Sequence, residues 1–464
     1  MIPSSEHVRA GNSPAGTEVY SEDLLFNVLR HEIMAREKIR IRRVDATFER
    51  EPLLRPFGFK GAFVSELWQT VVMLESEAGH SALGLGTQSV LWSDPRVFAS
   101  HTEAGGNALM FAVTERALQM AREADFGDPI ELLEDLLPRV LAYGEQITGR
   151  SRLRKTFALN ALVALDNAAW LLYAQAAGVH GFDAMIPDAY RPGLCYRHEH
   201  VACVPVVGYG TPLEEVEQAA GEGFFCIKVK LGHPGTQEEM LERDKQRLDA
   251  VHRVLGDLRS PFTSSGYAPY YFDANGRYES KETLHRLLDH AHRIGALDRI
   301  AIFEEPFPET CKEEVGDLGV RVAADESAHT DADALERIDL GYGAIALKPV
   351  AKTLSMTLKI AKVAEQYGVP CFCADLTVNP ILVDWNKMVA ARQAPFPGLG
   401  IGLLETNGHQ QYRNWKAMTN YHPRAGASWT DVKDGIFRLD DDFYKEDGGI
   451  FEVPQHYLGL VRRV

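Results

Sequence analysis

Residues 226–232, CIKVKLG, decide how the second half of this chain is interpreted. The run is apolar enough to form a buried β-strand, yet it contains Lys228 and Lys230. In a strand, residues two apart project to the same face, so both ammonium groups lie on one side. Two adjacent cations in a buried strand need other charges to meet them. The stretch therefore raises the prospect of a functional site beside this strand.

Seven further apolar runs of similar length surround this one. The eight runs are 202–210, 224–232, 270–276, 300–306, 320–327, 344–350, 369–375 and 398–406. Amphipathic helical stretches such as 238–256, 281–295 and 355–368 separate most of them. This alternation predicts an α/β fold, a (β/α)8 TIM-type barrel over residues 196–408. A doubly wound open sheet is the alternative, but the Gly-rich first turn of a dinucleotide-binding fold is missing.

The segments on either side of the barrel have a different texture. Residues 1–38 read as an extension with a helix at 22–38. Residues 39–195 show strand patterns first and helical patterns afterwards, which predicts an α+β capping domain. Its strand runs are 39–49 and 67–84 with a loop at 53–66 between them, and its helical runs are 108–124, 129–147 and 157–178. We expect residues 409–464 to pack back on the capping domain and complete it.

Composition and charge narrow the classes of partner. The 464 residues include 49 Lys plus Arg against 65 Asp plus Glu, a net charge of −16, with no basic stripe. We therefore expect no nucleic-acid partner. An apolar stretch of membrane-spanning length and a signal-peptide pattern are both absent from the sequence, so we expect a cytoplasmic protein without a membrane partner.

Charged residues recur where the predicted strands end. In chain order they are Lys228 and Lys230, Asp273 and Asn275, Glu304 and Glu305, Asp325 and Glu326, and Lys348. A single such acid is commonly a helix cap or a solvated loop charge. Three carboxylates at successive strand ends repel each other unless a cation joins them. A hard divalent ion with oxygen ligands, most simply one Mg²⁺ per site, meets that need.

The lysines have a chemical interpretation in this setting. A neighbouring cation and burial lower the pKa of a lysine, whereas carboxylates raise it, and a lysine that is neutral near pH 7 is a general base. Lys348 is on the sixth predicted strand and Lys230 on the second, so they should face each other across the barrel mouth. Two surface lysines on an edge strand are the alternative for the KVK triplet alone.

These residues in this order resemble the muconate-lactonising-enzyme-like subgroup of the enolase superfamily, in the mandelate racemase/muconate lactonizing enzyme family. The motifs are KVK at 228–230, FDAN with Asp273, FEEP with Glu304, ADES with Asp325 and ALKP with Lys348. The resemblance implies Mg²⁺-dependent abstraction of the proton α to a carboxylate through a metal-stabilised enediolate. It also implies metal ligation by Asp273, Glu304 and Asp325.

The resemblance further implies roles for the lysines and for the cap. Lys230 is the base on one face of the substrate, Lys348 is the acid or base on the other, and Lys228 lies beside the substrate carboxylate. Four further residues are candidates for substrate binding: Phe59 in the capping loop, Asn275, Asp375 and Glu405. Asp375 and Glu405 are equally explained as loop charges or caps. The expected partners are a small carboxylate substrate and, in a homo-oligomer, further copies of the chain.

A base on each face favours a racemase or epimerase. A lyase (an acid-sugar dehydratase or an o-succinylbenzoate-synthase-like enzyme) and a cycloisomerase use the same residues and stay open. A non-catalytic metal-binding relative would be marked by a lost ligand or lysine, and none is lost. The chain departs from the family pattern at residues 257–269, which look like an insertion, and around Lys352, where a Gly-Gly pair is usual.

Overall fold

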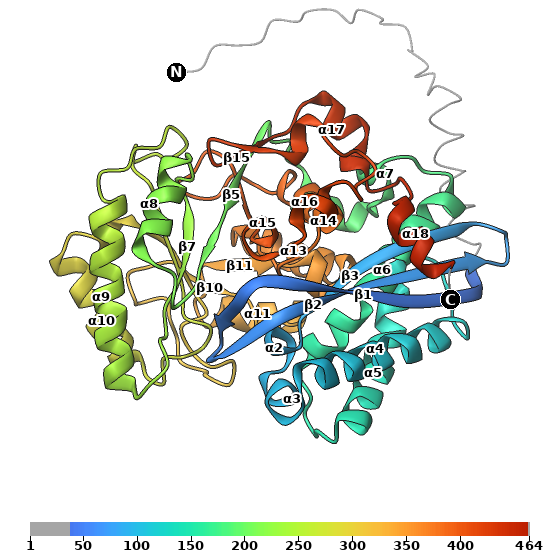
Figure 1. Cartoon of the computed structure of the whole chain (residues 1–464), viewed down its shortest axis with the longest axis horizontal. Helices are drawn as coiled ribbons and strands as arrows, with labels where there is room; N and C mark the ends of the chain where they lie inside the picture. The colour runs from blue at the N-terminus through green and yellow to red at the C-terminus, as the bar shows by residue number, and fades with distance from the viewer. Residues whose placement is uncertain (1–37, 463–464) are drawn as a thin grey trace, which may run out of the picture. The chain divides into compact units, whose positions relative to one another are not determined.

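The structure, a computed structural model, describes residues 38–462. Of these, residues 39–462 belong to one compact unit (Figure 1). The expected extension at residues 1–38, with its helix at 22–38, lies outside the described residues except for Lys38.

A four-stranded sheet begins the described chain. Its strands are β1 (Ile39–Phe59), β2 (Ala62–Ser76), β3 (Ser81–Gln88) and β4 (Asp125–Phe126), in the order β3-β2-β1-β4. β1 and β2 make a long hairpin whose turn is Lys60 and Gly61, at φ of +50° and +76°. The expected loop at 53–66 was wrong for most of its length, because Phe57, Gly58 and Phe59 pair with residues of β2. Their Gly- and Phe-rich composition hid the cross-strand ladder.

The helices that follow cover this sheet. They are α2 (Val90–Ser93), α3 (Pro95–Ser100), α4 (Glu103–Ala121), α5 (Pro129–Thr148) and α6 (Lys155–Ala177). α6 packs closely on β3 because Gly84 has no side chain: a Cβ there would lie 2.1 Å from the Ala164 carbonyl oxygen. Among the described residues, α6 alone is long and apolar enough to cross a membrane, but 94% of that apolar stretch is buried in the protein. Its apolar composition therefore serves the core.

The predicted barrel is present. Its strands are β5 (His200–Val204) with β6 (Val206–Val207), β7 (Ile227–Lys230), β8 (Tyr270–Asp273), β9 (Ile300–Glu304), β10 (Val322–Ala324), β11 (Ala344–Leu347), β12 (Cys371–Cys373) and β13 (Gly402–Glu405). β5 and β6 form one barrel strand interrupted by Pro205. Parallel pairing runs from β6 through β7 to β13 and returns to β5, which closes the ring.

Helices surround the ring between most strands. The long ones are α8 (Leu213–Gly221), α9 (Gln237–Leu255), α10 (Lys281–Arg293), α11 (Asp331–Asp339), α13 (Leu354–Gln366) and α14 (Pro380–Ala390). Short turns are α7 (Phe182–Met185), η1 (Asp188–Leu194), η2 (Leu297–Arg299) and α12 (Pro349–Lys352). Residues 305–321, between β9 and β10, contain no helix.

The inserted segment 257–269 lies at the N-terminal end of the barrel. The Phe262 ring stacks on Phe225, which precedes β7, with ring centroids 5.3 Å apart. Gly400, which precedes β13, donates its N–H to the Phe262 carbonyl at 2.9 Å. The insertion therefore covers the end of the barrel opposite the strand ends that carry the charged residues.

The C-terminal segment contacts both parts of the unit. Its elements are α15 (Gly408–Gln411), α16 (Trp415–Thr419), η3 (Ser428–Thr430), β14 (Val432–Lys433), β15 (Ile436–Arg438), α17 (Asp441–Lys445), η4 (Asp447–Gly449) and α18 (Gln455–Val461). α18 lies against β1 and β2 of the cap. β15 pairs antiparallel with β5, so the segment also extends the barrel sheet, which we had not expected.

Candidate active site

The C-terminal ends of the barrel strands surround one small cavity of about 40 Å³. Residues of the capping domain and of the barrel both line this cavity. Its lining includes Phe59, Lys228, Lys230, Asn275, Asp325, Lys348, Asp375 and Glu405 from the predicted site set. Asp273 and Glu304 lie behind this lining, where both contact Lys228. The structure thus brings all the predicted site residues together.

Lys228 lies among three buried carboxylates. Its Nζ is 2.9 Å from Asp273, 2.9 Å from Glu304 and 2.8 Å from Glu405. Burial alone would lower the pKa of Lys228, but these carboxylates outweigh it and raise that pKa well above its usual value. Lys228 is therefore a fixed positive charge.

The two candidate proton carriers lie on opposite sides of the ring, since β7 and β11 are four strands apart. Lys230 donates to Asp273, and Lys348 lies 2.6 Å from Asp325. An aromatic ring of the cap covers each one: Phe59 at 6.0 Å from the Lys230 Nζ and Trp92 at 4.7 Å from the Lys348 Nζ.

Buried carboxylates surround the ammonium group of Lys348. Burial lowers the pKa of Lys348, but Asp325 and Glu405 outweigh burial and hold that pKa above its usual value. The pKa of Lys348 is raised because carboxylates near it outnumber cations. The sequence shows that these acids exist but not which of them contact Lys348. These carboxylates favour the charged form of Lys348.

Three acids can offer oxygens to one cation. Glu304, Asp325 and Glu326 each have a carboxylate oxygen within 4.8 Å of the others. Asp325 Oδ1 and Glu326 Oε2 are buried without a hydrogen-bond partner. Burial, followed by repulsion from Asp273, raises the pKa of Glu304 well above its usual range. A hard divalent ion is bound by oxygen ligands such as carboxylates, so this cluster of three acids fits such an ion.

The expected ligand Asp273 has a different environment. Its carboxylate accepts from Lys230 and contacts Lys228, and these two cations outweigh burial and lower the pKa of Asp273. Glu326, which we had not predicted as a ligand, lies in the cluster instead. Its only sequence signal is that it follows Asp325.

Three of the four candidate substrate-binding residues, Asn275, Asp375 and Glu405, differ in the partners that they already have in the protein. Asn275 donates to Glu326 at 3.1 Å, and its Oδ1 has no partner. Asp375 accepts from the backbone N–H groups of Leu376, Val378 and Asn407. Burial, ahead of repulsion from Glu405, raises the pKa of Asp375 to about 6. Glu405 is held by Lys228, so Asp375 and Glu405 already have partners in the protein.

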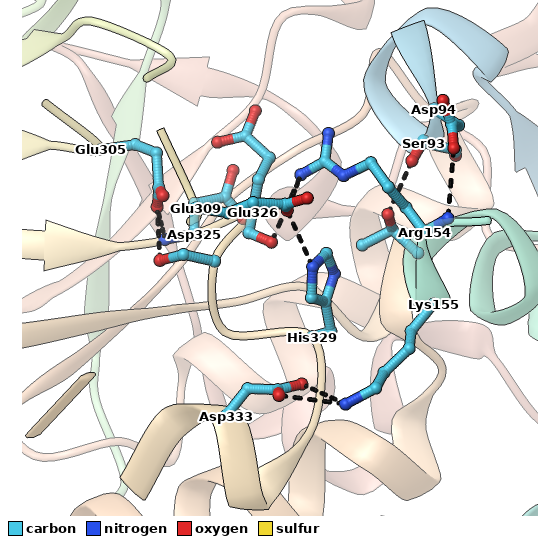
Figure 2. Close-up of polar contacts among 12 residues, drawn as sticks. Ser93, Asp94, Arg154, Lys155, Glu305, Glu309, Asp325, Glu326, His329 and Asp333 are labelled. Carbon is cyan, nitrogen blue, oxygen red and sulfur yellow. Dashed lines mark hydrogen bonds and ion pairs between the residues drawn. The ribbon is translucent and has the colours of Figure 1, made fainter. Parts of the chain in front are cut away.

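Backbone conformation also marks this end of the barrel. Asn275, Glu305, Thr353 and Thr377 all have positive φ, between +42° and +74°. Such conformations are unfavourable for residues with a side chain, and they concentrate at functional sites. Glu305 is the residue that directly follows β9. Its carboxylate accepts a hydrogen bond from the Asp325 N–H at 2.7 Å, as Figure 2 shows.

Sequence reasoning missed or left open several residues at this site. Lys352 is fully buried, with its Nζ 2.6 Å from the Asp325 carbonyl and 3.3 Å from Asp325 Oδ1. Lys352 is thus a second cation beside Asp325, in addition to Lys348. Trp92 comes from the four-residue helix α2, which no sequence pattern connects to the barrel. Lys60 lies in the turn between β1 and β2 and contacts Glu326.

Comparisons with known proteins agree with this fold. Residues 212–401 match the family model described as enolase C-terminal domain-like. A search of curated proteins found no match. Residues 212–401 therefore form an enolase C-terminal domain-like region.

Solved structures resemble most of the chain at low identity. A mandelate racemase/muconate lactonizing protein from Herpetosiphon aurantiacus is 17% identical, with a TM-score of 0.61 over 87% of this chain and 96% of that one. A dipeptide epimerase from Enterococcus faecalis V583, complexed with Mg and L-Leu-L-Tyr, is 16% identical, with a TM-score of 0.56 over 87% and 97%. An L-talarate dehydratase from Polaromonas sp. JS666, complexed with Mg and L-glucarate, is 18% identical, with a TM-score of 0.57 over 87% and 93%. These likenesses show a shared fold.

Proposed function

We propose that the chain is an enzyme that removes the proton α to the carboxylate of a small substrate, and that it works as a racemase or epimerase. The observation that carries this proposal is the pair Lys230 and Lys348, which line one cavity from opposite strands of the ring. A proton removed from one face of a carbon and returned to the other inverts that carbon.

We also propose that the site uses Mg²⁺, with Glu304 and Asp325 as ligands and either Asp273 or Glu326 as the third. The buried Glu326 Oε2, which has no hydrogen-bond partner, and the closeness of the three acids support this proposal. A bound divalent ion would supply positive charge that stabilises an enediolate. Lys228, with its raised pKa, adds a fixed positive charge on the β7 side.

The cap excludes water from the lysines. Phe59 and Trp92 lie over Lys230 and Lys348, and the cavity of about 40 Å³ is smaller than any carboxylate substrate with a side chain. Substrate entry therefore requires that lining side chains or the hairpin of β1 and β2 move. Such closure also strengthens the electrostatic interactions inside the site.

One observation favours a second candidate, a lyase. The carboxylates around Lys348 hold its pKa above the usual value, so it suits a fixed cation or an acid better than a base. In that case only Lys230 abstracts a proton, and a β-substituent leaves with help from an acid. The talarate dehydratase relative carries a lyase activity on the same fold, and a cycloisomerase would need no more than these residues.

The test is exchange of the substrate α-proton in D2O with Mg²⁺. A library of amino-acid, dipeptide and sugar-acid carboxylates is incubated with wild type, Lys230→Ala and Lys348→Ala, and read by mass spectrometry. For a racemase, each variant should lose exchange of one enantiomer by roughly 100-fold or more and keep exchange of the other. Lys362→Ala, on the outer helix α13, is the matched control.

The products separate the candidates. Inversion identifies a racemase or epimerase, whereas loss of water together with exchange that depends on Lys230 alone identifies a lyase. Absence of exchange across the library, with Mg²⁺ bound, would contradict both and favour a non-catalytic relative.

A further inference from the structure

The tip of the capping hairpin reaches the strand-end acids through Lys60. The Lys60 Nζ lies 3.0 Å from Glu326 Oε1 and donates to the Trp92 carbonyl at 3.0 Å. The side chains of Lys60 and Glu326 are 7% and 3% exposed, so this ion pair is shielded from solvent. Shielding strengthens the attraction between the two charges and makes the loss of either partner costly.

Glu326 has a second role available at its other oxygen. Oε1 is engaged by Lys60 and by the Asn275 amide at 3.1 Å. Oε2 is buried without a partner, and Glu326 offers an oxygen within 4.8 Å of those of Glu304 and Asp325. A buried carboxylate oxygen with no donor is unfavourable unless a cation completes it. Glu326 therefore lies between a cation of the cap and the cluster that fits a divalent ion.

The cap also holds the backbone of Glu326. Arg154, which precedes α6, approaches the Glu326 carbonyl at 3.5 Å and the Glu309 carboxylate at 2.6 Å (Figure 2). Glu309 in turn bonds His329 at 2.9 Å. Because its backbone is fixed from the cap, Glu326 responds to loss of Lys60 mainly through its carboxylate.

We propose that Lys60 and Glu326 are a positioning pair that couples closure of the capping hairpin to the charge of the metal site. This inference rests on the proposed function. When the hairpin is closed, the Lys60 ammonium group offsets part of the negative charge of the acid cluster formed by Glu304, Asp325 and Glu326. When the hairpin opens, Glu326 adds its full charge to Glu304 and Asp325. The Glu326 carboxylate thus has two roles. It holds the hairpin closed through Lys60, and it strengthens ion binding when the hairpin is open.

The test measures Mg²⁺ affinity of the full chain by calorimetry, without substrate. Lys60→Met should tighten Mg²⁺ binding by roughly tenfold, since the Glu326 carboxylate is then no longer paired with Lys60 and its charge is available to the ion. Glu326→Gln should weaken it by a similar factor, and adding Lys60→Met to Glu326→Gln should change nothing further. Lys60→Gln is a second, polar variant in case the methionine disturbs folding.

Arg55→Met is the matched control. Arg55 is on the same hairpin and pairs with Glu215 on α8, away from the acid cluster. Amide hydrogen exchange over residues 57–64 should rise in both Lys60→Met and Arg55→Met, but Mg²⁺ affinity should change only in the former. Damage to the fold would weaken binding, which is the opposite sign.

Two outcomes overturn the inference and are distinguishable. If wild type binds Mg²⁺ but Lys60→Met leaves the affinity unchanged or weakens it, the coupling is wrong and the proposed function stands. If wild type binds no Mg²⁺, the metal site of the proposed function fails, and the coupling fails with it.

Discussion

At the scale of single residues, Lys228 explains why two lysines lie side by side in a buried strand. Its ammonium contacts Asp273, Glu304 and Glu405, which come from three other strands. Without that cation, three buried carboxylates would face each other. Lys228 therefore contributes to folding as well as to the charge of the site.

We expect Lys228→Met to lower the free energy of unfolding by about 3–5 kcal/mol, because it leaves buried carboxylates without their shared cation. Mg²⁺ should restore part of the loss, since a cation again joins the acids. Thermal unfolding with and without Mg²⁺ measures both effects. Lys362→Met on α13 is the control, and a loss below about 1 kcal/mol would show that Lys228 is not the cation that holds these acids.

Single residues also show which features of the site could be predicted from the sequence. The strand-end positions of Lys230, Asp273 and Lys348 follow from the period of the barrel and the motifs. The structure places Lys230 and Lys348 in the lining of one cavity and Asp273 behind it, bonded to Lys230. Their charge states depend on which carboxylate contacts which lysine. The raised pKa of Lys348 and the position of Glu326 arise from such contacts, which the sequence does not contain.

At the scale of elements, strands that lie within longer apolar runs were predictable, and the short strands β14 and β15, which lie outside such runs, were not. β14 and β15 have two and three residues, too few for a hydrophobic period, yet β15 pairs with β5. In the hairpin of β1 and β2, Gly58 and Pro52 interrupt the alternation that normally marks a strand. Pairing with β2 overrides that local preference.

The inserted segment 257–269 gives a prediction at this scale. Phe262 packs with Phe225 in the core at the N-terminal end of the barrel. We expect Phe262→Ala to lower the free energy of unfolding by about 2–4 kcal/mol and to leave Mg²⁺ affinity unchanged, because the acids lie at the other end. Chemical denaturation and calorimetry test the two parts. Tyr367→Ala, at a side chain that is 55% exposed, should change neither.

At the scale of the whole molecule, the cap and the barrel meet at a buried carboxylate. Asp166 on α6 accepts from the Ser355 hydroxyl at 2.5 Å and from the Ser355 N–H at 3.1 Å, at the start of α13. The Trp170 indole donates to the same hydroxyl at 3.0 Å. Burial is the largest influence on Asp166 and raises its pKa to about 7, despite these hydrogen bonds.

This raised pKa predicts how stability depends on pH. Between the ordinary pKa of an aspartate, about 4, and the folded value of about 7, the folded chain holds a proton that the unfolded chain has lost. The free energy of unfolding from this group therefore falls as pH rises through that window and is flat above it.

Asp166→Asn removes the ionisation, so the difference in free energy of unfolding, variant minus wild type, should rise by about 3 kcal/mol from pH 5 to pH 8. Asn keeps one acceptor for the Ser355 N–H, and its amide can donate to the Ser355 hydroxyl. Urea unfolding at several pH values makes the measurement, and Asp289→Asn, at an exposed carboxylate on α10, should give a difference independent of pH. A flat difference for Asp166→Asn would mean that the carboxylate is already ionised at pH 5 in the folded chain, with its charge stabilised by the helix α13 terminus and the Ser355 hydrogen bonds.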